Sequence, residues 1–215
     1  PGVNVLLERN RFCRGTRPAS VDRIVITVNT DTSQSLLQVR AGQADYDLGG
    51  LPPTAHADLA SSFGVRRAGP GRYFVNPTLG VTYLALNTAS PFFSDPARRK
   101  AINWAIDRPA LLRVGGKLAG TRTDQIIPPS VPGFRQARLY AIKGADPIMS
   151  RKVAPGIGGQ LRLLHTTSPT STARAQVIQY NLRQIGVDVK LDPQPFGVAI
   201  KSAGTKGADF DMFLI

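Results

Sequence analysis

The first half of the chain alternates between strand-like and helix-like patterns of hydrophobic residues. Residues 21–29 alternate β-branched and polar side chains, which predicts a strand with one buried face. Residues 31–42 place leucines at helical spacing between a capping aspartate and a glycine, and residues 55–64 predict a second helix. Three shorter strand-like runs lie at residues 44–50, 72–77 and 81–88. This alternation is typical of α/β proteins.

A basic amphipathic helix is predicted at residues 95–107. Asp95 is a suitable N-cap, and Pro96 falls at the first helical position, where its missing N–H is not needed. Four residues form one apolar stripe: Ala101, Ile102, Ala105 and Ile106. We expect this stripe to pack on the core and the basic residues, among them Arg98 and Arg99, to form a solvated surface.

The second half opens with a loop-rich region and ends with regular elements. Residues 115–160 are rich in Gly and Pro, with at most a helical turn or two within residues 137–153. A strand at 160–167, a helix at 170–186 and a strand at 187–193 follow. Their order predicts a βαβ unit with parallel strands.

Composition narrows the class of protein. The chain has 215 residues, of which 42% are hydrophobic, so it can bury a core. Its net charge of +13 would favour polyanions, but the basic residues are scattered and no nucleic-acid-binding motif accompanies them. No apolar run is long enough to span a bilayer, and no signal peptide opens the chain. We therefore expect either a cytosolic protein or a piece of a longer one.

Metal and nucleotide chemistry find little support. His56 and His165 are the only histidines, and neither has a Cys, Asp or Glu at the spacing of metal ligands. No glycine-rich phosphate loop lies between a strand and a helix. We expect no metal and no cofactor.

Two acidic pairs and one cysteine are the remaining candidates for catalysis. Asp45/Asp47 and Asp209/Asp211 are spaced two apart, which in a strand puts both carboxylates on one face, as general acid–base catalysis could use. Their simpler interpretation is as polar starts of strands around a buried aromatic residue. Cys13 lies among arginines without a nearby histidine, which favours a structural role.

Several long segments, taken in order, resemble one family. They are "ERNRFCRGTRPASVDRIVITV", "LLQVRAGQADYDL", "YLALNTASPFFSDPARRKAINWAIDRPALL", "IIPPSVPGF", "VIQYNLRQIGVDVKLDP" and "ADFDMFLI". The order is similar to that of the bacterial extracellular solute-binding proteins of oligopeptide and dipeptide ABC importers. Phe12 and Cys13 stand where the family usually has Tyr-Trp, and the family's N-terminal and C-terminal portions have no counterpart, which implies an internal fragment.

The resemblance implies an incomplete α/β fold of the two-lobed periplasmic-binding-protein-like (type II) class. Residues 1–82 would form part of the first lobe and residues 83–215 part of the second. Loops after strands would contact a solute in a cleft between the lobes, and the candidate contacts are Gly49, Gly50, Leu51, Pro52, Tyr83, Asn87 and Thr88.

The implied function is the substrate-binding component of an ABC importer, taking up a peptide or a similar small solute without catalysis or cofactor. Its partners would be a permease and the remainder of the same protein or a second chain that completes the fold. It would be periplasmic or extracellular and held by a lipid anchor outside this segment. A small α/β enzyme, a hydrolase or transferase using Asp45/Asp47 or Cys13, is the alternative, and a basic nucleic-acid-binding module is a weaker one.

Overall fold

A computed structural model describes residues 4–16, 20–28, 31–140 and 143–215. The contacts divide the chain into two compact units, Pro1–His56 and Ala57–Ile215, and each is described by itself. The lobe boundary predicted after residue 82 stays a prediction. Position 29, the last of the predicted first strand, lies outside the described residues.

The first unit begins with a two-stranded antiparallel ribbon. β1 (Asn4–Glu8) pairs with β2 (Arg23–Thr27) from Asn4 opposite Thr27 to Glu8 opposite Arg23. The predicted strand is confirmed, but its predicted buried face is wrong, because Ile24 is 48% exposed and the other β2 side chains are exposed or half-buried. Alternation gives a strand two chemically different faces, and burial needs a further layer packed on one of them.

α1 (Thr32–Arg40) is confirmed, with Asp31 as its N-cap. The Asp31 carboxylate accepts the backbone N–H groups of Ser33 and Gln34. The strand predicted at residues 44–50 is wrong: this segment is a series of bends, and the Asp47 carboxylate accepts the Gly49 N–H at 2.6 Å. A strand needs a neighbouring strand as hydrogen-bond partner, and this segment pairs with none of the described residues.

A short 3₁₀ helix, η1 (Pro53–Ala55), leads directly into α2 (His56–Phe63). α2 matches the helix predicted at residues 55–64. Beyond it, the strand predicted at residues 72–77 is reduced to an isolated bridge between Arg66 and Phe74.

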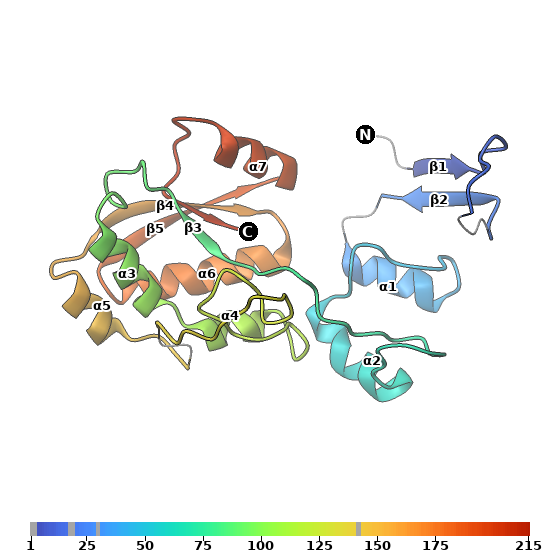
Figure 1. Cartoon of the computed structure of the whole chain (residues 1–215), viewed down its shortest axis with the longest axis horizontal. Helices are drawn as coiled ribbons and strands as arrows, with labels where there is room; N and C mark the ends of the chain where they lie inside the picture. Colours follow the sequence, from blue (N-terminus) through green and yellow to red (C-terminus); the bar gives the residue numbers. More distant parts are fainter. Residues whose placement is uncertain (1–3, 17–19, 29–30, 141–142) are drawn as a thin grey trace. The chain divides into compact units, whose positions relative to one another are not determined.

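The second unit is built on a four-stranded sheet in the order β3-β6-β4-β5 (Figure 1). β4 (Gly159–Thr166) pairs in parallel with β5 (Val187–Gln194) and with β6 (Met212–Leu214), which confirms the predicted βαβ unit. β3 (Leu84–Leu86), at one edge, runs antiparallel to β6 and is the short ordered core of the strand predicted at residues 81–88.

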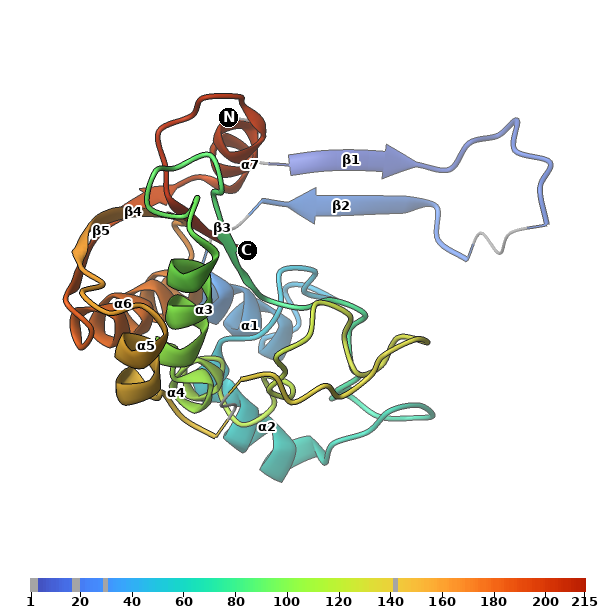
Figure 2. The same ribbon diagram turned by 60° about the vertical axis from the view of Figure 1, so that its left-hand side comes forward.

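Helices cover both faces of this sheet. α6 (Pro169–Arg183), α3 (Pro96–Ala105), α4 (Arg108–Val114) and α5 (Pro147–Val153) gather on one side, and α7 (Phe196–Gly204) lies on the other (Figures 1 and 2). The larger core includes Leu163, Ile178, Leu182 and Met212, and the smaller one consists of Leu164, Ala199 and Phe213. α4 and α7 were not predicted, because each is short and begins in a Pro-containing stretch.

α3 confirms the basic helix predicted at residues 95–107. Asp95 caps it by accepting the Ala97 N–H at 2.7 Å, and Ala101, Ile102 and Ala105 are buried in the larger core. The expected burial of its apolar stripe is therefore observed.

The expectation that the basic face of α3 is a solvated surface is wrong in part. Arg98 stacks on the Phe92 ring at 4.8 Å, and Arg99 donates to the carbonyl oxygens of Phe93 and Ser94. Long arginine stems cover apolar surface while the guanidinium finds acceptors, so both side chains are half-buried. They attach the Pro-Phe-Phe turn to the helix.

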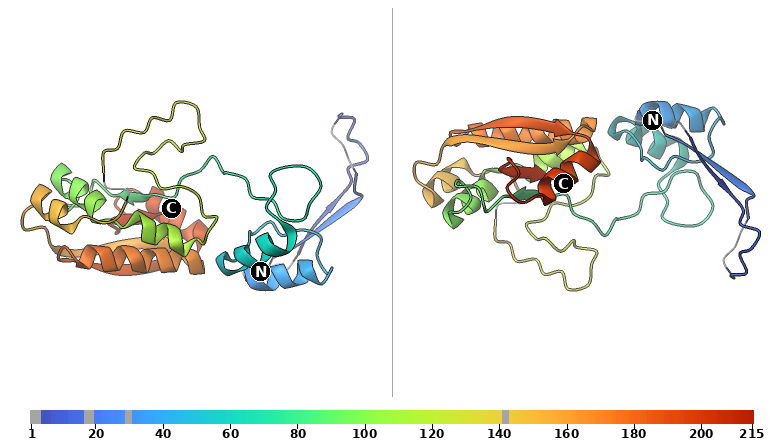
Figure 3. Two further views of the ribbon diagram at one scale, coloured as in Figure 1. Left: turned by 90° about the horizontal axis from the view of Figure 1, so that it is seen from below. Right: turned by 90° about the horizontal axis from the view of Figure 1, so that it is seen from above.

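The loop between α4 and α5 is irregular over most of its length, as predicted (Figure 3). Asp124 in this loop accepts the backbone N–H groups of Leu139 and Tyr140, which joins the two ends of residues 124–140. The Tyr140 ring then meets the Trp104 ring of α3 edge to face, with centroids 5.6 Å apart.

Candidate functional site

Four of the predicted contact residues belong to the first unit. Gly49 and Gly50 are exposed, Leu51 is half-buried and Pro52 is buried just before η1. Gly50 has a φ of 90°, a left-handed conformation that favours glycine. Their predicted contact with a solute stays a prediction.

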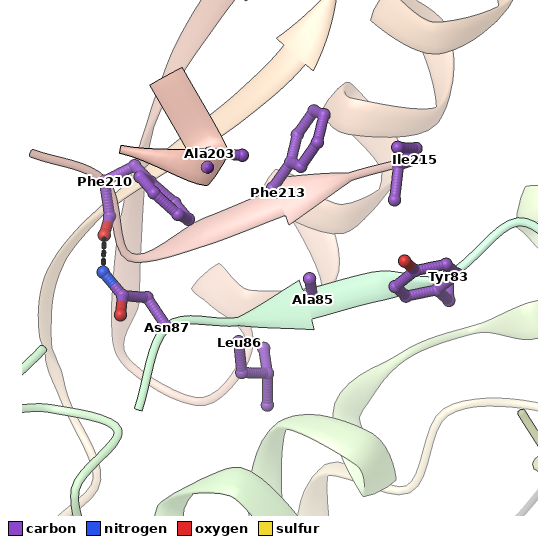
Figure 4. A pocket seen from close by; sticks show the side chains of 9 residues that line it. Tyr83, Ala85, Leu86, Asn87, Ala203, Phe210, Phe213 and Ile215 are labelled. Carbon is purple, nitrogen blue, oxygen red and sulfur yellow. Dashed lines mark hydrogen bonds between the residues drawn. The ribbon is translucent and has the colours of Figure 1, made fainter. Parts of the chain in front are cut away.

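The other three predicted contacts flank β3 in the second unit. Tyr83 precedes the strand and exchanges backbone hydrogen bonds with Ile215, at 2.7 and 3.1 Å. Tyr83 and Asn87 lie at opposite ends of a shallow hollow of about 340 Å³, whose floor includes Ala85 and Phe213 (Figure 4). Thr88 lies in the exposed turn that follows and does not line this hollow.

Asn87 joins the end of β3 to the start of β6. Its side-chain amide donates to the Phe210 carbonyl oxygen at 2.8 Å, and its backbone N–H donates to the Asp211 carbonyl oxygen at 2.8 Å (Figure 4). Its side-chain oxygen accepts the Ala89 N–H at 3.1 Å. Both ends of the Asn87 amide therefore have protein partners.

Asp211 connects three segments at the same place. One carboxylate oxygen accepts the Ser90 hydroxyl, and the other accepts the Arg162 backbone N–H of β4 at 2.8 Å. The Arg162 guanidinium then pairs with Asp192 of β5 at 2.9 Å and with Asp209 at 2.6 Å. The hydrogen bond that the Arg162 side chain donates to Asp192 is the main reason that the pKa of Arg162 is raised.

These contacts give structural roles to one of the two acidic pairs considered for catalysis. Asp209 and Asp211 both have structural partners, and the strand that would have aligned Asp45 with Asp47 is not formed. Cys13 is exposed in the turn between β1 and β2, so burial does not account for it as a structural cysteine.

The histidines do not form a metal site. His165 is 1% exposed in β4, and its Nδ1 lies 2.8 Å from the Thr166 carbonyl oxygen, which fits the strand position expected for it. His56 begins α2. Within residues 4–16, 20–28, 31–140 and 143–215, no cluster of His, Cys, Asp or Glu could hold a metal ion.

A larger cavity of about 690 Å³ opens on the opposite side of β3 and β6 and lies entirely within the second unit. Its apolar wall comes from the sheet and from α3 and α6, and includes Leu84, Leu86, Ile102, Ile178 and Leu214. The remaining wall is formed by α4, which contributes Arg108, Leu111 and Leu112, and by residues 77–83 and 119–130. A concave apolar surface with a few polar groups is the usual form of a small-molecule site.

Four charged residues line this cavity. Three are arginines and one is an aspartate: Arg108, Arg122, Arg174 and Asp124. Burial lowers the pKa of Arg108, although the nearby Asp124 and Tyr140 act in the opposite direction. Arg108 donates to the backbone and side-chain oxygens of Asn103, at 3.0 and 3.2 Å.

Asp124 keeps its charge through hydrogen bonds. Burial acts to raise the pKa of Asp124, but hydrogen bonds from the Gln125 side chain and from the Tyr140 and Leu139 backbone outweigh it and hold the pKa below its ordinary value. The cavity lining is therefore ionised, with more positive than negative charge.

Of the predicted contact residues, only Tyr83 lines this cavity, and sequence reasoning missed the cavity's arginines. One signal was present: Arg174 lies four residues before Ile178 and so shares the apolar face of α6. An arginine on the buried face of a helix is unusual and indicates a specific role for its charge. The loop residues that complete the cavity carry no comparable signal.

The fold is that of periplasmic binding proteins, in part. The chain is similar to the periplasmic binding protein AgaA from A. tumefaciens R10 in complex with agropinic acid, with a TM-score of 0.78, 24% identity, and coverage of 100% of this chain and 43% of that one. It is also similar to the binding protein DppA from Helicobacter pylori in complex with a peptide, with a TM-score of 0.81, 21% identity, and coverage of 99% of this chain and 40% of that one. The fold of this chain is therefore incomplete, as predicted.

The chain belongs to the bacterial extracellular solute-binding proteins, family 5, whose middle region matches residues 1–215. A curated relative is the glutathione-binding protein GsiB of Escherichia coli (strain K12), 27% identical over 146 residues. The match covers 64% of this chain and 28% of that protein. The predicted family is confirmed, and its members are transport proteins rather than enzymes. Among the described residues, no helix is long and apolar enough to cross a bilayer.

Proposed function

We propose that this protein is the substrate-binding component of an ABC importer and that it binds a peptide or a similar small solute without changing it. The observation that carries the proposal is the match of the family over residues 1–215. The relatives are named for the binding of glutathione, of a peptide and of agropinic acid, all small and polar. The enzyme and nucleic-acid alternatives gain no comparable support.

The cavity of about 690 Å³ in the second unit supports the same proposal. Its volume falls within the range of roughly 300–1,000 Å³ that is usual for small-molecule sites. The hollow beside Tyr83 and Asn87 is half as large and lies on the other side of the same two strands. We propose that the larger cavity forms part of the solute site in the complete protein, and the solute contacts predicted at Gly49 to Pro52 stay a separate prediction.

Three further features belong to the proposal. The protein acts outside the cytoplasm, in the periplasm or at the cell surface, and it delivers its solute to a transporter permease. A lipid anchor outside this segment holds it at the membrane. The family description as extracellular supports the location.

A ligand screen tests the proposal. The melting temperature of the full-length protein is measured with a tripeptide pool, with glutathione and with nickel complexes. A salt titration of its binding to duplex DNA serves as the control for charge. A rise in melting temperature with one class of solute, with that solute recovered intact by mass spectrometry, is expected. Turnover of the solute, or only salt-steep DNA binding, would contradict it.

A further inference from the structure

Two half-buried arginines face the larger cavity, and their surroundings differ. Arg108 has the two oxygens of Asn103 as acceptors and Asp124 as a nearby anion. Arg174, in the second turn of α6, lines the same cavity, and none of the described residues accepts a hydrogen bond from it or forms an ion pair with it. Partial removal of a guanidinium from water without an acceptor is unfavourable, and the half-buried Arg174 therefore has free capacity to bind an anion.

Gly115 makes room for the Arg174 side chain. Gly115 follows α4 with an ordinary φ of −78°, so its backbone does not require glycine. A Cβ atom at this position would lie 2.8 Å from Nη2 of Arg174 and 2.5 Å from Cβ of Ala119. The absence of a side chain at residue 115 therefore allows the guanidinium to lie against the end of α4.

The cavity is lined by more positive than negative charge and therefore favours anions. Arg108, Arg122 and Arg174 line it against Asp124 alone. The Asp124 oxygens already accept the Leu139, Tyr140 and Gln125 N–H groups. This aspartate therefore has little capacity left to neutralise Arg174.

We infer that Arg174 binds a carboxylate group of the solute inside this cavity, so that the protein selects solutes carrying a carboxylate. This inference rests on the proposed function and specifies its substrate class. The planar guanidinium fork matches a carboxylate in a bidentate pair, which supplies both charge and direction. The neighbouring apolar wall, with Ile178 and Leu214, takes the rest of the solute.

The protonation of Arg174 agrees with this assignment. Burial lowers the pKa of Arg174, and no neighbouring anion offsets that effect. Arginine nevertheless remains charged in proteins, so the cost of its partial desolvation persists until an anion arrives. A bound carboxylate would relieve it.

The experiment compares two tripeptide pools of equal composition, one with free C-terminal carboxylates and one with C-terminal amides. Binding is measured by calorimetry with the full-length protein, with Arg174→Gln and with Arg183→Gln. Arg183 is an exposed arginine at the end of the same helix and serves as the matched control. We expect the wild type and Arg183→Gln to bind the acid pool more tightly than the amide pool, and Arg174→Gln to lose roughly 10- to 100-fold for the acid pool only.

Melting temperature without solute provides a second readout. If Arg174 has no ionic partner in the solute-free protein, Arg174→Met removes an uncompensated charge and leaves the melting temperature unchanged or raises it. A lower melting temperature would mean that an acidic side chain of the protein itself is the partner, and would overturn the inference. Equal binding of both pools by the wild type would also overturn it while leaving the proposed function standing. Binding of neither pool would overturn the inference, and the screen with glutathione and nickel complexes would then decide whether the proposed function stands.

Discussion

The side-chain amide of Asn87 donates a hydrogen bond to the carbonyl oxygen of Phe210, across 123 positions of sequence. This contact closes the start of β6 against the end of β3, and Asp211 extends it to Ser90 and to the backbone of β4. β3 has three residues in its ladder, so contacts at its end contribute much of what holds it in the sheet. Asn87 is therefore a structural connector between strands.

Replacing Asn87 by Ala is expected to lower the free energy of unfolding by about 1–2 kcal/mol, because the Phe210 carbonyl oxygen loses its side-chain donor. Thr88→Ala, in the adjacent exposed turn, is the matched control and should change it by less than about 0.5 kcal/mol. Urea denaturation of both variants measures the difference. Equal effects of the two substitutions would show that the Asn87 contact is not structural.

The two ion pairs of Arg162 should differ in strength. The Asp209 pair is shorter, at 2.6 Å against 2.9 Å, but the Asp209 side chain is 93% exposed and that of Asp192 only 17%. Water screens the exposed pair, so Asp192→Asn should destabilise the fold by about 1 kcal/mol and Asp209→Asn by less than about 0.5 kcal/mol. Chemical denaturation at low and high salt measures both variants, and a larger loss from Asp209→Asn would contradict this ranking.

Asp124 should make stability depend on pH on the acid side. Its folded pKa lies below the ordinary value of 3.8, so its contribution is complete above about pH 5 and is lost as the pH falls through the folded pKa. Asp124→Asn should therefore lower stability at pH 6 and flatten the decline between pH 5 and 3. Asp188→Asn, at an exposed aspartate, is the matched control. A profile that Asp124→Asn leaves parallel to that of the wild type would contradict the assignment.

The elements that the sequence predicted best are those whose local pattern agrees with their packing. α3 has a cap, a first-turn proline and an apolar stripe, and Ile102 is buried where the stripe requires it. The βαβ unit of β4, α6 and β5 was predicted for the same reason. Residues 44–47 and 208–211 have the same Ala-Asp-aromatic-Asp pattern, and local sequence could not show that only the second leads into a strand. β6 forms by pairing with β3 and β4, whereas residues 44–50 form no strand pair with any of the described residues.

The candidate site was harder to predict, because it depends on contacts between distant segments. Asn87 was chosen as a solute contact from its place after a strand, yet its amide is used by Phe210 and Ala89. Arg174 was overlooked because its place in the cavity depends on Gly115 and on the loop around Asp124, which are far from it in sequence. Only the folded chain shows that, of the two half-buried arginines of the cavity, Arg108 has acceptors and Arg174 has none among the described residues.

The most direct test of the central claim is equilibrium dialysis of the full-length protein against the tripeptide pool, followed by mass spectrometry of the retained and released solutes. The account predicts that part of the pool is retained, is displaced by excess competitor and leaves the protein with its mass unchanged. Products of cleavage or group transfer among the released molecules, or retention of no small solute of any class, would contradict it.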